Sequence, residues 1–133
     1  MRVRVRGLNV LASSKLQTII WTARMPEAEY FYGTLLELRC KGKSHGALVY
    51  DVGGGELRVS PVPSTQPSAH TVLGFAVPDV EAIVAILRAR GVAVERFPGL
   101  PHDAAGILLT PEGAKVAWIR DPDGNLLSIV QYA

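Results

Sequence analysis

The sequence has few of the features that stabilise disulfide-rich or membrane-bound proteins. Its single cysteine, Cys40, excludes an intrachain disulfide and a cysteine-based zinc site. Its apolar runs fall far short of the ~20 residues that a membrane-spanning helix needs. The stretch 7–12, which follows the basic N-terminus, is too short and too polar for the core of a signal peptide. We therefore expect a soluble, cytoplasmic protein without membrane contacts.

The chain also lacks a strong excess of either charge. It has 14 basic and 12 acidic residues and a net charge of +2, a balance that does not predict nucleic-acid binding. The hydrophobic content of 48% and the charged content of 20% argue against disorder. A chain of 133 residues fits one domain that buries enough surface to fold unaided.

Hydrophobic periodicity predicts a strand, a helix and three short strands in the first half. The β-branched stretch 15–23 is typical of a strand, and Pro26 suits the first turn of a helix with an apolar stripe through Ala28, Phe31, Tyr32 and Leu35. Further strands are expected at 37–40, 46–51 and 56–60, the last two joined by a glycine turn at 53–55. The segment 61–68 (PVPSTQPS) is typical of a linker.

The second half repeats this order. A strand is predicted at 71–77, and Asp79 suits the N-cap of a helix that ends at Gly91. Strands are then expected at 92–97, 115–120 and 125–131, with a long loop at 98–113 and a tight turn at 121–124. The sequence thus predicts an α+β fold in one domain, residues 1–133: module one at about 16–60, a linker at 61–70, module two at about 71–132, and an N-terminal extension at 1–15.

Three segments in this doubled arrangement resemble the vicinal-oxygen-chelate superfamily, which includes glyoxalase I, bleomycin-resistance proteins and extradiol dioxygenases. They are 28–36 (AEYFYGTLL), 73–80 (LGFAVPDV) and 118–128 (WIRDPDGNLLS), and the last is the most specific. The resemblance covers roughly residues 16–132. It implies two tandem βαβββ modules whose curved mixed sheets surround a cleft, with the helices on the outer faces.

Metal-using members of this superfamily hold a divalent cation with His, Gln or Glu side chains from four strands. By resemblance, the position in the first strand falls on Gln17 and the position in the fifth strand on Val72. The position in the fourth strand falls on Arg58, or on Glu56 if the register shifts by two. The final position falls on Ser128. Because valine cannot bind a metal and three or four ligands are usual, we expect no metal cofactor. One alternative remains, a shifted divalent-metal site formed by Gln17, Glu56 and His70.

Without a metal, the expected cleft still offers the features of a small-molecule site. Period-two alternation places the candidate ligand-binding residues on the cleft faces of their strands. Tryptophan rings suit a flat ligand, and an arginine binds a carboxylate or phosphate through paired hydrogen bonds. The candidates are Gln17, Trp21, Arg58, Trp118 and Ser128.

Three hypotheses follow. The first is a metal-free binder of a small aromatic or amphipathic molecule. The second is a divalent-metal lyase, isomerase or dioxygenase of the same superfamily. The third is an association domain, which the exposed sheet edges and the segment 7–12 would permit. Catalytic residues are not assigned, and a homodimer is expected by resemblance alone.

Overall fold

The computed structural model describes residues 10–133, so residues 7–9 of the segment 7–12 named above lie outside it. The first sheet contains β1 (Gln17–Thr22), β2 (Arg39–Ser44), β3 (Ala47–Val52) and β4 (Gly55–Pro61). Its strand order is β1-β4-β3-β2, with β1 parallel to β4 and the other neighbours antiparallel. The helical segment after β1 begins as α1 (Met25–Glu29) and continues as the π-helix η1 (Tyr30–Leu35).

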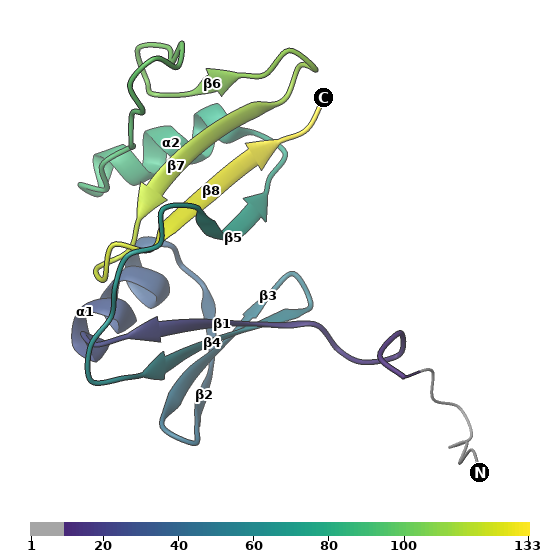
Figure 1. Cartoon of the computed structure of the whole chain (residues 1–133), viewed down its shortest axis with the longest axis vertical. Helices are drawn as coiled ribbons and strands as arrows, with labels where there is room; N and C mark the ends of the chain where they lie inside the picture. The colour runs from purple at the N-terminus through teal and green to yellow at the C-terminus, as the bar shows by residue number, and fades with distance from the viewer. Residues whose placement is uncertain (1–9) are drawn as a thin grey trace.

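The second sheet has the same topology. Its strands are β5 (Thr71–Ala76), β6 (Leu108–Leu109), β7 (Lys115–Arg120) and β8 (Leu126–Gln131), in the order β5-β8-β7-β6. Here β5 runs parallel to β8, and helix α2 (Val80–Ala89) packs against β7 and β8. The predicted duplication of βαβββ modules is therefore confirmed (Figure 1).

Local chemistry explains where these elements begin and end. The Asp79 carboxylate caps α2 by accepting a 3.1 Å hydrogen bond from the Ala82 N–H. Gly91 ends the helix with a φ of +83°, a conformation that favours glycine. In the first module, Gly53 and Gly54 form the turn between β3 and β4, both with positive φ.

Two of the strand predictions are wrong in detail. Residues 92–97 do not form a strand; they have one strand-like bond to β7, from the Glu95 N–H to the Trp118 carbonyl at 2.8 Å. The edge strand of this sheet is the two-residue β6, inside the segment predicted as a loop. In the first module, β2 covers Arg39–Ser44 rather than the predicted 37–40, and its turn to β3 is confined to residues 45–46.

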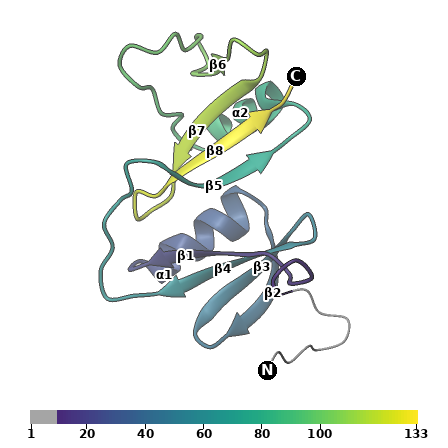
Figure 2. The same ribbon diagram turned by 45° about the vertical axis from the view of Figure 1, so that its right-hand side comes forward.

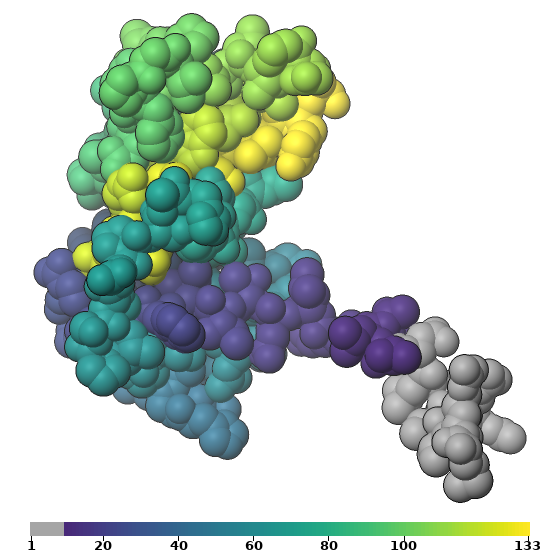
Figure 3. Space-filling model, in the orientation of Figure 1, coloured from purple at the N-terminus to yellow at the C-terminus, as the bar shows by residue number. Residues whose placement is uncertain are grey.

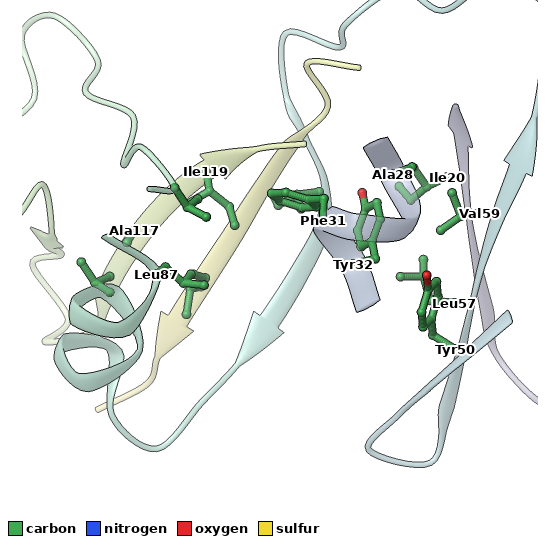
Figure 4. Close-up of a cluster of buried hydrophobic side chains, with 14 of the residues drawn as sticks. Ile20, Ala28, Phe31, Tyr32, Tyr50, Leu57, Val59, Leu87, Ala117 and Ile119 are labelled. Carbon is green, nitrogen blue, oxygen red and sulfur yellow. The ribbon is translucent and has the colours of Figure 1, made fainter. Parts of the chain in front are cut away.

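A single hydrophobic core joins the two modules. The first helical segment lies on the side of the first sheet that faces the second module (Figures 1 and 2). From η1, the Tyr32 ring lies near that of Tyr50 of the first sheet, with 6.3 Å between centroids, while Phe31 points toward Ile119 of the second (Figure 4). Phe31 is 5% exposed and Tyr32 is fully buried. Two adjacent residues of the π-helix thus connect both halves of the core.

Each helix covers one face of its sheet. In β4, Leu57 and Val59 are buried, whereas Glu56, Arg58 and Ser60 are half-buried on the opposite face. In β1, Ile20 and Thr22 are buried, whereas Ile19 and Trp21 remain 53% and 64% exposed. This alternation agrees with the predicted assignment of side chains to core and open faces. Within residues 10–133, no helix has the length and apolar character needed to cross a membrane.

Candidate functional site

The linker between β4 and β5 borders a half-open cavity between the modules. In the space-filling view the linker residues cross the junction on the molecular surface (Figure 3). The cavity has a volume of about 430 Å³. Its walls are Ile19, Ile20 and Trp21 of β1, Val72 of β5, Asn125, and linker residues 64–66 and 68. Every side chain in this lining is uncharged.

Trp21 is the one predicted site residue in the wall of this cavity. Its ring is largely exposed, and its backbone carbonyl accepts a 3.4 Å hydrogen bond from Asn125 Nδ2. The Thr65 hydroxyl donates to the Asp123 carboxylate, and Ser68 Oγ lies 3.1 Å from the ring of His70. The cavity therefore combines one exposed aromatic ring, aliphatic side chains and short polar groups, a composition suited to a small organic ligand.

The other predicted site residues lie on the sheet faces that the helices do not cover, which we call the open faces. Gln17 is exposed, Arg58 and Trp118 are half-buried, and Ser128 is only 8% exposed. In the first sheet Gln17 stands opposite Glu56 and Ile19 opposite Arg58. The Arg58 guanidinium donates a 2.9 Å hydrogen bond to the Ser44 carbonyl, and the Glu56 carboxylate lies 3.4 Å from the Lys41 amine. The strand register thus makes Glu56, rather than Arg58, the neighbour of Gln17.

In the second sheet Ser128 lies on β8, between β5 and β7. It lies directly opposite Trp118 on β7 and Gly74 on β5, so these three positions share a face. A Cβ at residue 74 would lie 2.9 Å from Ser128 Oγ, so glycine leaves room for this hydroxyl. The register between β5 and β8 shifts between Thr71 and Leu73, which places Val72 at an irregularity of the ladder.

The donors on these faces do not fit the cation that the resemblance implies. Gln17 and Glu56 are adjacent, but the second sheet offers a glycine and a serine at its paired central positions. His70 is exposed, and its Nδ1 lies 3.1 Å from Ser68 Oγ. Within the described part of the chain, no group of three or more His, Cys, Asp or Glu side chains could hold a metal ion. Divalent cations in proteins ordinarily require three or four such ligands.

Sequence reasoning missed the second role of the turn at 121–124. The turn forms as predicted, with the Gly124 N–H donating to the Asp121 carbonyl at 2.9 Å. Asp121 also accepts a 2.6 Å hydrogen bond from the Tyr32 hydroxyl of the first module. Burial raises the pKa of Tyr32, and the neighbouring charge of Asp121 raises it further, so this hydroxyl keeps its proton.

Asp123 makes the second half of this connection. Its carboxylate accepts hydrogen bonds from the Thr22 hydroxyl, from the Ala23 N–H at 2.8 Å and from the Thr65 hydroxyl at 2.9 Å. Asp121 and Asp123 are 6% and 9% exposed. We call the contacts of these two carboxylates with Thr22, Ala23, Tyr32 and Thr65 the inter-module latch. The latch holds the end of β1 and the linker, which are two walls of the cavity.

The chain belongs to the Glyoxalase/Bleomycin resistance protein/Dioxygenase superfamily, because the sequence profile of this family matches residues 15–129. No curated protein sequence matches at a significant level. The resemblance described above is therefore confirmed for most of the chain.

Solved structures show the same fold at low sequence identity. Lactoylglutathione lyase from Agrobacterium tumefaciens has a TM-score of 0.68 and 20% identity, with 90% of this chain and 93% of that chain covered. A glyoxalase/bleomycin resistance protein/dioxygenase from Alicyclobacillus acidocaldarius has a TM-score of 0.65 and 20% identity, covering 90% and 92%. An integron cassette protein from the mobile metagenome of V. cholerae has a TM-score of 0.65 and 20% identity, covering 95% and 100%.

Proposed function

We propose that the protein binds a small, uncharged aromatic or amphipathic molecule in the cavity between its modules. The observation that carries this proposal is the lining of the cavity, which places the exposed Trp21 ring beside Ile19 and Val72 and contains no charged side chain. The volume of about 430 Å³ lies within the range of roughly 300–1,000 Å³ that is usual for small-molecule sites.

The lining narrows the class of ligand. A planar ring would stack on the indole of Trp21, with its apolar edge against Ile19 and Val72. The Ser64 hydroxyl and the Gln66 and Asn125 amides offer both donors and acceptors to a neutral polar group. A charged ligand would lose hydration there without gaining an ionic partner. Arg58, the candidate anion clamp on the open face, already donates to the Ser44 carbonyl.

A pair of fluorescent probes that differ in charge tests this proposal. N-phenyl-1-naphthylamine is neutral, whereas anilinonaphthalene sulfonate carries a similar aromatic system with an anionic group. We expect the neutral probe to bind more tightly, and Trp21→Ala to weaken its binding by about tenfold, equivalent to about 1.4 kcal/mol. Trp118→Ala, in a tryptophan outside this cavity, is the matched control. Equal effects of the two substitutions, or tighter binding of the anion, would contradict the proposal.

One observation favours a second candidate, a divalent-metal lyase, isomerase or dioxygenase. Gln17 and Glu56 stand opposite each other and offer two oxygen donors. Equilibrium dialysis against Mn²⁺, Ni²⁺ and Zn²⁺, followed by metal analysis, tests it. Stoichiometric metal that is lost in Glu56→Gln would favour this candidate over a metal-free binder, whereas equal background content in both proteins would exclude this pair as a metal site.

We also propose a homodimer, on the basis of the family resemblance. Light scattering should then give twice the monomer mass of 14.3 kDa. A mass of 14.3 kDa at micromolar concentration would refute a stable dimer.

A further inference from the structure

A loop segment in the second module is held by a histidine. Residues 97–106, which we call the strap, lie at the edge of the second sheet, where His102 forms an isolated β-bridge with Leu108 of β6. His102 is half-buried, and its ring lies 6.1 Å from the ring of Phe97 and 6.0 Å from that of Trp118, measured between centroids. Phe97 and Trp118 meet edge to face at 5.3 Å. The strap therefore covers part of Trp118 with two rings.

Both nitrogens of the His102 ring have partners of defined polarity. Nε2 accepts a 3.0 Å hydrogen bond from the Phe97 backbone N–H, so this nitrogen carries no proton. Nδ1 lies 2.8 Å from the Gly106 carbonyl oxygen, which can only accept, so Nδ1 carries the proton. The ring thus joins both ends of the strap as the neutral Nδ1–H tautomer. A proton on Nε2 would face the Phe97 N–H and break this bond.

The charged side chains around the strap have other partners. Arg96 donates to the carbonyls of Asp103 and Ala104 at 2.9 and 2.8 Å, and the Asp103 carboxylate accepts the N–H groups of Ala105 and Ile107 at 2.9 Å. Arg120 and Lys115 of β7 pair with Glu95 and Glu81 at 2.6 and 2.8 Å. Within residues 10–133, no carboxylate is hydrogen-bonded to the imidazole to retain it once it is charged.

We propose that His102 is a proton-sensitive clasp: its neutral ring holds the strap over Trp118, and protonation of Nε2 releases the strap and exposes this tryptophan. The strap is closed at high pH, because only the neutral ring accepts the Phe97 N–H bond. It opens at acid pH, when the ring takes up a second proton on Nε2. Trp118 lies opposite Ser128, which is 8% exposed, so opening would increase the exposure of this part of the second sheet. The inference does not depend on the proposed ligand.

Acrylamide quenching of tryptophan fluorescence tests the clasp. The chain has two tryptophans, so Trp21→Phe leaves Trp118 as the only one, and excitation at the long-wavelength edge of the absorption band avoids emission from the tyrosines. In this variant we expect the quenching constant to rise roughly twofold between about pH 7.5 and about pH 5. Adding His102→Gln should abolish the pH dependence, because glutamine remains neutral throughout. Circular dichroism at both pH values confirms that each variant is folded.

The other two histidines supply matched controls. His45 and His70 are exposed, and the variants His45→Gln and His70→Gln should retain the full pH response. Nitrogen chemical shifts of the His102 ring provide a measurement that needs no substitution, and they should show the Nδ1–H tautomer near pH 7.5. A quenching constant that does not change with pH, a response that persists in His102→Gln, or an Nε2–H tautomer would overturn the proposal.

Discussion

At the residue scale, two buried carboxylates connect halves of the chain that are far apart in sequence. Thr22 and Asp123 are 101 positions apart, and Tyr32 and Asp121 are 89 apart. Asp–Pro–Asp–Gly predicts a tight turn because its proline and glycine suit the backbone geometry. Nothing local to the turn shows that each carboxylate also accepts hydrogen bonds from the first module. Such partners become visible only when the two modules are packed together.

The latch leads to a prediction about stability. Asp123→Asn replaces one of the two acceptor oxygens of residue 123 by a donor nitrogen. The asparagine side chain can therefore not accept the hydrogen bonds from Thr22, Ala23 and Thr65 all at once. We expect a loss of about 1–3 kcal/mol in the free energy of unfolding, as for hydrogen bonds to a buried charged group. Urea denaturation measures this loss. In a double-mutant cycle with Thr22→Val, the two losses should be less than additive; strict additivity would show that this pair does not interact.

The buried tyrosines lead to a prediction about alkaline pH. Burial, with smaller contributions from Cys40 and Glu29, raises the pKa of Tyr50 to about 12. In the unfolded chain this side chain ionises near pH 10. Between these values the unfolded state releases a proton that the folded state keeps, so stability is full below about pH 10 and falls as the pH rises.

Urea denaturation at about pH 9 and about pH 11 measures this fall, and Tyr50→Phe should remove up to about 1.4 kcal/mol of it per pH unit. Tyr30→Phe is the control, because Tyr30 is 58% exposed and should leave the fall unchanged. Equal pH dependence in Tyr50→Phe and in the unmodified protein would show that burial of Tyr50 does not cause the effect.

At the scale of elements, sequence periodicity identified those whose partners lie within one module. Helix α2 forms after its predicted cap, Asp79, and buries Val80, Val84 and Leu87, and the glycine turn between β3 and β4 forms where expected. Residues 92–97 have strand-like residues but do not form a ladder beside β7, because a strand depends on a neighbouring strand in register. The irregularity of the ladder at Val72 could not be predicted from the sequence either, since the register of a strand depends on the neighbouring strand with which it pairs.

The strap offers a prediction from two glycines of similar conformation. Gly99 and Gly106 have φ values of +84° and +90°, so alanine is strained at either position. A Cβ at residue 99 would meet open space, whereas one at residue 106 would lie 2.7 Å from a methyl group of Val94. We expect Gly106→Ala to cost about 1–3 kcal/mol more than Gly99→Ala in urea denaturation. Equal losses would show that the strap does not pack tightly against Val94.

At the scale of the whole molecule, duplication produces a shared core on one side and open sheet faces on the other. The family and the paired modules were predictable because the segments that carry them are local. Of the five residues predicted to bind a ligand, only Trp21 borders the cavity between the modules. The linker residues and Asn125 were not predicted. Their place in the cavity wall depends on the packing of the two modules and on the hydrogen bond that holds Thr65 of the linker to Asp123.

The central claim, a ligand site between the modules, is tested most directly by mapping amide chemical shifts while the neutral naphthylamine probe is added to saturation. The account predicts that the largest shifts cluster at residues 19–21, 64–66, 68, 72 and 125, which surround the cavity. Shifts confined to the open faces around Arg58 and Ser128, or scattered over the surface without saturation, would contradict it.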